Sequence, residues 1–291
     1  MPEPGSERSR YWCCLNTRDG ADTLDETLDS IAGQTIPPSF MVVVDDGSTD
    51  GTAALLEKRR VSFPQLYSVR TNSTTRDIRR VPILLNLGIE CARKVIGSSA
   101  MPKFMMLSGD DNLLAPDLAA SIMERMDADS GIAVASGDWL SAAGRTNQMP
   151  HGGGRFVRMD FMESLGWRYP VAYGWETWLL YKAMQRGFKV KTFSDIRYKH
   201  LRPYRPKNIA GWGRGMYSLG FPSVFVALRF GLNLIWTRRG TQTAESDVMM
   251  MAGYLSAKVN PGPLGPNLIS DDGLKAFVRR YTMSRLTRLP W

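Results

Sequence analysis

The sequence predicts an α/β fold in which a Rossmann-like, mainly parallel sheet is flanked by helices, and three observations support this prediction. Short apolar runs alternate with helical patterns from residue 11 to about residue 140, an order that is typical of a parallel sheet. Three of these runs end abruptly in polar residues, as strands do where a ligand binds at the edge of such a sheet. Hydrophobic residues make up 43% of the 291 residues and charged residues 22%, as in ordinary globular chains.

The strands are predicted from short runs of apolar and β-branched residues. The run at 40–44 contains three consecutive valines and is followed directly by two aspartates, which indicates a strand that is buried on both faces. The predicted strands lie at 11–16, 40–44, 66–69, 104–107, 132–135, 188–193 and 196–200.

The helices are predicted from apolar residues that recur every three or four positions. Leu24, Leu28 and Ile31 have this spacing. A second helix should begin near Thr49, where Ser, Thr and Asp residues are available as caps. The predicted helices lie near 24–31, 49–60, 83–95, 115–126, 158–166, 175–186, 222–236 and 275–288.

The N-terminus and the cysteines indicate a cytoplasmic protein. Residues 1–10 are polar and contain no apolar stretch, so we expect no secretory signal peptide. Cys13 and Cys14 are adjacent on a predicted strand, so their side chains should point to opposite faces and should not pair. Unpaired thiols fit a reducing, intracellular setting.

Positive charge is concentrated at the C-terminal end of the chain. Residues 196–291 contain 15 basic and 4 acidic residues, a net charge of +11, whereas residues 1–195 contain 22 basic and 24 acidic residues, a net charge of −2. This asymmetry indicates a polyanionic partner, either nucleic acid or an anionic membrane surface. The alternative is a basic tail that only aids solubility.

The segment 222–236 is apolar, but it is too short, and too polar at its middle, to span a bilayer. Its apolar face and nearby arginines suit a helix that lies in the interface of an anionic membrane. Phe221, Val224, Leu228 and Leu232 would then insert into the membrane. The alternative is a helix that covers the sheet of its own domain.

Acidic pairs follow two of the predicted strands. The first strand ends in Asn16-Thr17-Arg18, the second in Asp45-Asp46 and the fourth in Asp110-Asp111. Carboxylates gathered in this way repel one another unless a cation lies between them, and Mg²⁺ or Mn²⁺ prefers such oxygen ligands. The alternative is that each aspartate only caps the next helix.

A longer motif covers the second predicted strand and the turn after it. Residues 43–52 read V-V-D-D-G-S-T-D-G-T, which resembles the V-D-D-G-S-T-D-G-T signature of family 2 glycosyltransferases. Further stretches resemble other parts of this family in the same order, over roughly residues 11–240: Thr17-Arg18-Asp19, Asn86 to Lys94, Phe104 to Asp117, Gly174 to Leu180 and His200 to Pro203.

This resemblance implies a GT-A fold, a nucleotide-sugar donor, a divalent cation (Mg²⁺ or Mn²⁺) and inversion at the anomeric carbon. We expect a UDP-sugar rather than a GDP-sugar. Asp111 would ligate the metal, and His200 would close the site as a second ligand. The residues implied in donor binding are Asn16, Thr17, Arg18, Asp46, Arg80 and Asp110.

The sequence departs from the family pattern at two positions. Gly109 replaces the first acid of the metal-binding D-x-D motif, and Thr177 replaces the acid that commonly deprotonates the acceptor hydroxyl. Threonine does not act as a base near neutral pH, so we assign the catalytic base to Glu176. Between Trp175 and Trp178 its carboxylate should be partly desolvated, which would make it a better base. The alternative is that Glu176 only binds the acceptor or starts a helix, and that another acid is the base.

The leading functional hypothesis is a metal-dependent, inverting glycosyltransferase of the hexosyltransferase type. Its catalytic domain would span 1–204, with a donor-binding half at 1–140 and an acceptor half at 141–204, and a helical, basic extension would span 205–291. We expect a lipid-linked or growing glycan as acceptor, peripheral association with the cytoplasmic membrane face, and no nucleic acid. The alternatives are a nucleotidyltransferase of similar architecture and a nucleic-acid-binding protein that uses its basic C-terminal third.

Overall fold

The computed structural model of the chain describes residues 10–75, 77, 79–97, 100–139, 149–203, 208–236, 244–261 and 267–286. The chain divides into two compact units, and each is described by itself. Unit 1 comprises Met1–Arg76, Ile83–Tyr169 and Gly187–Tyr204. Unit 2 comprises Asp77–Pro82, Pro170–Arg186 and Arg205–Trp291.

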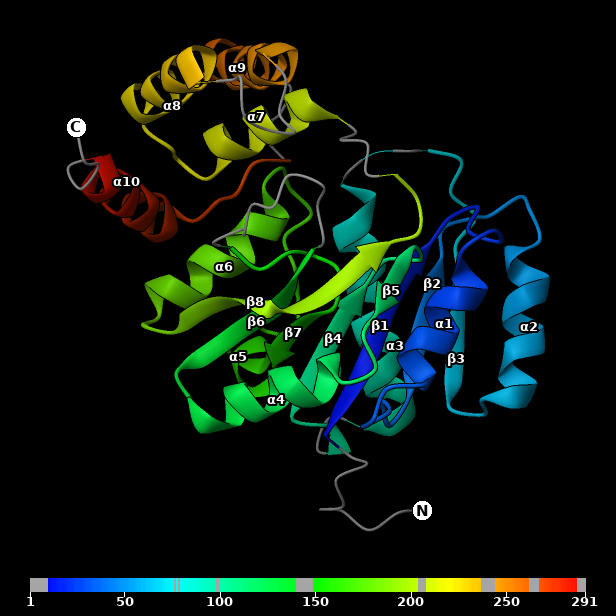
Figure 1. Cartoon of the computed structure of the whole chain (residues 1–291). Coiled ribbons are helices and arrows are strands. Elements are labelled where there is room, and N and C mark those ends of the chain that lie inside the picture. The colour runs from blue at the N-terminus through cyan, green and yellow to red at the C-terminus, as the bar shows by residue number, and fades with distance from the viewer. Residues whose placement is uncertain are drawn as a thin grey trace. The chain divides into compact units, whose positions relative to one another are not determined.

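Unit 1 is built on one sheet. Among the described residues, eight strands form this sheet in the order β3-β2-β1-β4-β7-β6-β8-β5 (Figure 1). The strands are β1 (Tyr11–Thr17), β2 (Met41–Asp45), β3 (Leu66–Arg70), β4 (Phe104–Ser108), β5 (Asn112–Leu114), β6 (Ile132–Trp139), β7 (Arg155–Arg158) and β8 (Lys189–His200). β1 to β4 are parallel, and so are β6 and β8, whereas β7 and β5 run antiparallel to their neighbours.

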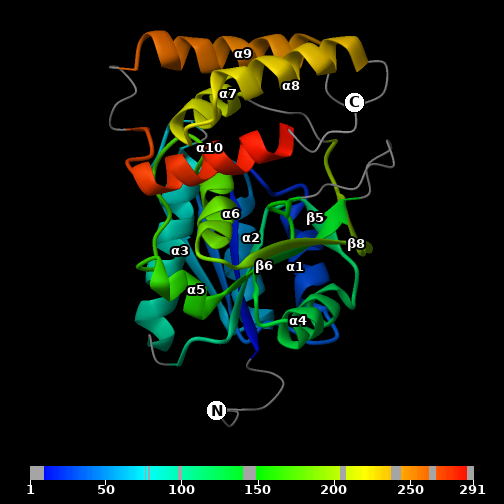
Figure 2. The same ribbon diagram turned by 90° about the vertical axis from the view of Figure 1, so that its left-hand side faces the viewer.

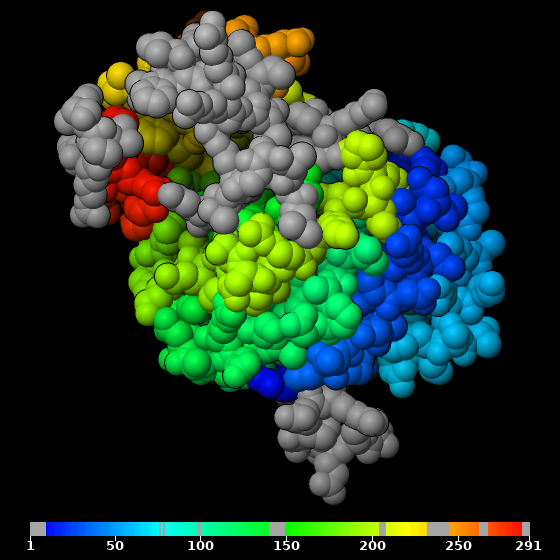
Figure 3. Space-filling view, in the orientation of Figure 1, coloured from blue at the N-terminus to red at the C-terminus, as the bar shows by residue number. Residues whose placement is uncertain are grey.

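Helices cover both faces of this sheet (Figures 1 and 2). They are α1 (Leu24–Ala32), α2 (Thr52–Ser62), α3 (Arg80–Ile96), α4 (Leu118–Ala128) and α5 (Met159–Ser164). Buried side chains of α1, α2 and α4 form one core with alternate residues of the central strands. In the space-filling view, β8 in yellow-green packs beside α4 in green (Figure 3).

The alternation of side chains along β1 explains why both faces are covered. Cys13 belongs to the core beneath α1 and α4, whereas Cys14 faces α3, where an added Cβ on Gly88 would lie 2.5 Å from the Cys14 sulfur. Successive residues of a strand point to opposite faces. Both thiols are buried and unpaired, as the sequence predicts.

Unit 2 is helical in its described C-terminal part. Its helices are α6 (Trp175–Gln185), α7 (Ile209–Ser218), α8 (Ser223–Trp236), α9 (Ala244–Val259) and α10 (Asp272–Leu286). α7 and α9 cross at very short distance: a Cβ added to Gly213 would lie only 1.9 Å from the Met250 carbonyl oxygen. Lys182 on α6 pairs at 2.7 Å with Asp271, the residue before α10.

The predicted membrane face of 222–236 needs a correction. Phe221 is only 8% exposed, and its ring packs 5.8 Å from that of Tyr181, so it does not insert into a membrane as expected. Val224 and Leu228 are 50% and 45% exposed, and the side chain of Leu232 lies outside the described residues. None of the helices in the described ranges is long and apolar enough to cross a bilayer.

The sequence patterns miss four elements of secondary structure, and they predict two strands where the structure has one. β5, β7, α7 and α9 are not predicted, and the strands expected at 188–193 and 196–200 form the single strand β8. The register between β6 and β8 shifts between Gly137 and Asp138, where β8 advances from Phe193 to Arg197. A β-bulge of this kind interrupts the alternation of a strand without ending it.

Candidate active site

The polar residues that follow three strands meet at one edge of the sheet. β1 lies between β2 and β4, so their carboxyl ends are neighbours. The Asp46 N–H, just beyond β2, donates to the Thr17 carbonyl at the end of β1, at 2.9 Å. Ligands bind at this edge in open α/β sheets.

Asp45 holds the turn after β2 in place. The Ser48 N–H donates to the Asp45 Oδ1 at 2.8 Å, and the Ser48 hydroxyl donates to the same oxygen at 2.5 Å. Asp45 is 2% exposed. A side chain that accepts from the backbone three residues later stabilises a turn. Asp45 therefore has a structural role in the turn, but it does not cap the next helix, whose N-cap is Gly51.

The Asp46 carboxylate, in contrast, lies beside a hydroxyl and a guanidinium. The Thr71 hydroxyl donates to its Oδ1 at 2.8 Å, and the Arg18 guanidinium lies 3.6 Å from its Oδ2. The Arg18 guanidinium also donates to the Thr75 carbonyl at 2.5 Å. The side-chain oxygen of Asn16 is buried without a hydrogen-bond partner. An unsatisfied buried acceptor of this kind is unusual and is typical of a binding site.

Asp110, whose side chain is 14% exposed, lies between a hydroxyl and a guanidinium. The Thr17 hydroxyl donates to its Oδ2 at 2.7 Å, and the Arg202 guanidinium lies 3.4 Å from its Oδ1. An added Cβ on Gly20 would lie 2.5 Å from the same Oδ2, so glycine is needed at position 20. Burial raises the pKa of Asp110, despite its bond from Thr17 and the nearby charge of Arg202.

Asp111 and His200 come together at the end of β8. The His200 Nδ1 lies 3.4 Å from the Asp111 Oδ1, and the Leu201 N–H donates to the Asp111 carbonyl at 2.7 Å. The Trp139 and Tyr198 rings meet the His200 ring edge-on, at 5.1 and 5.6 Å between centroids. These contacts hold the imidazole in place while both side chains keep some solvent exposure, 18% for His200 and 26% for Asp111.

The donor set fits a divalent cation that is completed by a substrate. Within the described ranges, no three His, Cys, Asp or Glu side chains gather as a metal cluster. Asp110 is already engaged by Thr17 and Arg202. Asp111 and His200 supply one oxygen and one nitrogen donor, and Mg²⁺ or Mn²⁺ commonly takes the rest of its ligands from phosphates and water.

Arg202 is a site residue to which the sequence analysis gives no role. Its guanidinium pairs with Asp22, lies 3.3 Å from the Asp19 carbonyl and approaches Asp110. The hydrogen bond from Arg202 lowers the pKa of Asp22. Arg202 lies in the motif His200-Leu201-Arg202-Pro203, which is the only sequence signal for it.

The family model for glycosyl transferase family 2 matches residues 13–188, more than half of the chain. The chain belongs to glycosyltransferase family 2. Sequence comparison with curated proteins finds no match. The family assignment confirms the enzyme class predicted from the V-D-D-G-S-T motif, and it favours a glycosyltransferase over a nucleotidyltransferase.

Solved glycosyltransferase structures share the fold. A mannosyltransferase from Pyrobaculum calidifontis, in complex with GDP-Man and Mn²⁺, is 18% identical, with a TM-score of 0.55 over 97% of this chain and 76% of that one. S. aureus TarS 1-349 in complex with UDP is 15% identical, with a TM-score of 0.55 over 85% and 71%. Glucosyl-3-phosphoglycerate synthase from Mycobacterium tuberculosis, in complex with Mn²⁺, UDP-Glc and phosphoglyceric acid, is 15% identical, with a TM-score of 0.52 over 74% and 85%. The predicted GT-A fold class is therefore confirmed.

Two predicted residues of this glycosyltransferase lie in unit 2. Glu176 lies in the first turn of α6 and is exposed, so the expected desolvation between Trp175 and Trp178 is wrong. Trp178 is buried, whereas Glu176, two residues earlier, is exposed. Arg80 begins α3 directly after Arg79, whose guanidinium pairs with Asp77 and lies 5.3 Å from the centre of the Tyr173 ring.

Proposed function

We propose that this glycosyltransferase moves a sugar from a nucleoside-diphosphate sugar to a hydroxyl acceptor, with inversion and with help from Mg²⁺ or Mn²⁺. The observation that carries the proposal is the pairing of Asp111 with His200, at 3.4 Å, beside the partly buried Asp110. At this edge of the parallel sheet, a carboxylate and an imidazole could hold the divalent cation that binds the diphosphate of a nucleotide sugar.

The nucleoside end of the donor would bind along the ends of β1 and β2. Asp46 would accept a hydrogen bond from the base, and Asn16 and Arg18 would line the same pocket. Thr17 and Asp110, joined by a 2.7 Å hydrogen bond, would lie by the ribose. We place UDP-sugars before GDP-sugars, supported by the UDP and UDP-Glc named for two similar structures, although a third is named with GDP-Man.

Two positive groups would balance the negative charge on the leaving diphosphate. A cation held by Asp111 and His200 would supply Lewis-acid stabilisation of the leaving group when bound. Arg80 would add a guanidinium, which pairs with phosphate through directed, charge-assisted hydrogen bonds. Arg79 and Arg214 also lie against the Tyr173 ring in unit 2, where Asp77 compensates the charge of Arg79.

The acceptor hydroxyl would lose its proton to Glu176. An exposed carboxylate in the first turn of a helix is accessible to an incoming acceptor, and Thr177 offers no acid beside it. Inversion requires the deprotonated hydroxyl to attack the anomeric carbon from the side opposite to the leaving diphosphate, so one base is sufficient.

Asp111→Asn tests this proposal. Release of nucleoside diphosphate from UDP- and GDP-sugars is measured with Mn²⁺, with and without EDTA. Loss of a residue that only supports a metal ligand typically lowers activity roughly 10–100-fold. Because Asp111 would bind the metal directly, we expect a larger loss in the variant. Asp29→Asn, an exposed carboxylate on α1 of the same unit, is the matched control and should keep wild-type turnover. Wild-type turnover that persists in EDTA would contradict metal dependence.

We also propose that the protein works at the cytoplasmic face of a membrane, on a lipid-linked or growing glycan. Val224 and Leu228 on α8 are about half exposed. On α9, Val248, Leu255 and Val259 are exposed at spacings that place them on one side of the helix. Exposed apolar side chains within residues 196–291, a region of net charge +11, support binding to an anionic membrane rather than to nucleic acid.

A further inference from the structure

A cavity of about 330 Å³ lies within unit 2, among the ends of its C-terminal helices. Three basic side chains line it, Lys258 from α9 and Lys275 and Arg279 from α10, and none of the lining residues is acidic. The volume is at the lower end of the range typical of small-molecule sites. The cavity therefore combines a modest size with a strong excess of positive charge.

The first turn of α8 opens into the same cavity. Pro222 and Ser223, where α8 begins, are among the lining residues. The first N–H groups of a helix have no partner within it, and together with the helix dipole they favour an anion. α8 has 14 residues, so the dipole is fully developed.

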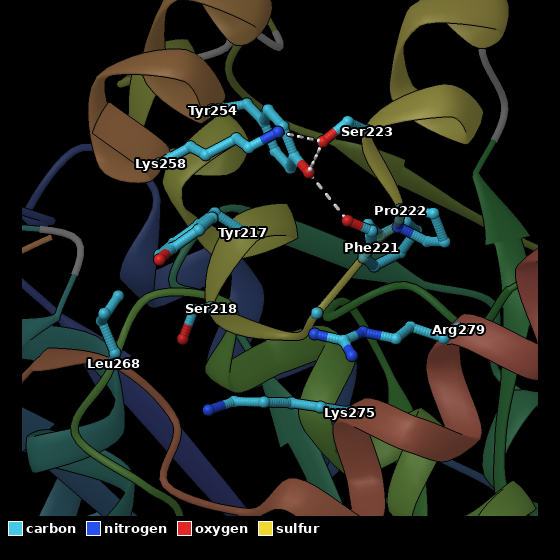
Figure 4. A pocket seen from close by; sticks show the side chains of 11 residues that line it. Tyr217, Ser218, Phe221, Pro222, Ser223, Tyr254, Lys258, Leu268, Lys275 and Arg279 are labelled. Carbon is cyan, nitrogen blue, oxygen red and sulfur yellow. Dashed lines mark hydrogen bonds between the residues drawn. The ribbon is translucent and has the colours of Figure 1, made fainter. Parts of the chain in front are cut away.

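Hydrogen bonds hold the upper wall of the cavity in position. The Lys258 ammonium donates to the Ser223 hydroxyl at 2.8 Å, and the buried Tyr254 hydroxyl donates to the Phe221 carbonyl at 2.8 Å (Figure 4). The Ser223 and Tyr254 hydroxyls are 3.1 Å apart. These bonds fix the position of the Lys258 ammonium, whose remaining N–H groups can donate to a ligand.

The lower wall carries positive charge that is only weakly compensated. Lys275 lies 3.6 Å from Asp272, a fully exposed carboxylate, and Asp271 is engaged by Lys182 at 2.7 Å. No described residue forms an ion pair with Arg279, whose guanidinium extends into the cavity (Figure 4). A guanidinium and two ammonium groups around one space match the charge and geometry of a phosphate group.

We propose that this cavity binds a phosphate monoester or diphosphate group, held by Lys258, Lys275, Arg279 and the first turn of α8. The group belongs either to a soluble phosphorylated molecule or to a phospholipid headgroup. The site lies entirely in unit 2 and does not depend on the donor chemistry assigned to Asp111 and His200.

Binding of inorganic pyrophosphate to the full chain tests the proposal, by calorimetry in EDTA so that no metal-bound diphosphate contributes. Arg279→Ala should weaken binding about tenfold or more, since one hydrogen bond between charged groups contributes that much. Arg280→Ala is the matched control: its side chain is equally exposed on α10 and does not line the cavity. Lys275→Gln provides a second variant.

Vesicles distinguish the two sources of the phosphate. Phosphatidylcholine vesicles that contain phosphatidic acid are compared with vesicles that contain phosphatidylserine at equal surface charge. Preference for phosphatidic acid that Arg279→Ala removes indicates a lipid headgroup, whereas an effect on pyrophosphate alone indicates a soluble ligand. Equal effects of Arg279→Ala and Arg280→Ala, or no binding of either probe, would overturn the proposal in favour of diffuse surface charge.

Discussion

Asp110 and Asp111 are adjacent in the chain, yet their carboxylates have different surroundings. Asp110 is held by Thr17 and Arg202 and is 14% exposed, whereas Asp111 lies beside His200 and is 26% exposed. The first carboxylate is therefore suited to hold the site together and the second to bind a cation. Their order along the chain alone does not reveal this division, because it depends on the distant Arg202.

Asp110→Asn separates stability from binding. Burial raises the pKa of Asp110, so its ionised form is disfavoured in the folded state. Its contribution to the free energy of unfolding is thus greatest below the unfolded-state pKa and falls as pH rises through the folded-state pKa. As the pH rises from the unfolded-state to the folded-state pKa, we expect the Asp110→Asn variant to become more stable relative to wild type. Its affinity for the donor should be roughly tenfold lower.

Thermal unfolding between about pH 3 and pH 7, across the usual carboxylate range, measures this difference. Asp22→Asn is the opposing control, because the hydrogen bond from Arg202 lowers the pKa of Asp22. Asp22 stabilises the fold above its unfolded-state pKa, and this effect disappears as pH falls; it should be small, since the side chain is 67% exposed. The same pH trend in both variants would contradict the assignment.

Glu176→Gln keeps the shape and hydrogen bonding of the proposed base but removes its ability to accept a proton. We expect kcat to fall roughly 10²-fold or more, with little change in the KM for the donor, and the acidic limb of the pH–rate profile to disappear. Glu245→Gln, in the exposed first turn of α9, is the matched control. A Glu176→Gln variant with wild-type kcat would require another base.

At the scale of elements, the sequence predicts those strands and helices whose own residues favour them, and it misses those that depend on packing. β1, β2 and β4 are continuous apolar runs, and each is found where the sequence predicts it. α7 carries three glycines, Gly211, Gly213 and Gly215, a composition that disfavours a helix. Gly213 lets α9 approach and Gly215 packs against Gly174, contacts that only the packed unit provides.

Gly253→Ala tests this crossing of α7 and α9. The added Cβ would lie 2.0 Å from the Ala210 carbonyl oxygen, and overpacking of this kind typically costs about 1–3 kcal/mol. Gly231→Ala on α8 is the matched control, because nothing lies within 4 Å of its added Cβ. It should stabilise α8 by up to about 1 kcal/mol. Chemical denaturation measures both; equal stabilities would contradict the close crossing.

At the scale of the whole molecule, charge and apolar exposure concentrate in the same C-terminal region. The sequence predicts the charge asymmetry and the apolar segment, but it does not separate the inward from the outward side of that segment. Val226 and Phe230 are buried in unit 2, whereas Val224 and Leu228 are exposed. Phe221 packs against Tyr181 on α6, a contact between residues forty positions apart that a local pattern does not show, and for this reason its expected insertion into a membrane is wrong.

Membrane binding should therefore depend on Val224 and Leu228. Each basic residue near an anionic surface contributes about 1 kcal/mol, which salt screens, whereas burial of apolar side chains is not screened. Wild-type protein should sediment with anionic vesicles at low salt and be only partly released at high salt. Val224→Asp combined with Leu228→Asp should remain in the supernatant. Val61→Asp combined with Val95→Asp, at exposed valines of unit 1, should sediment like wild type, and equal release of both double variants would show that the α8 face is not the anchor.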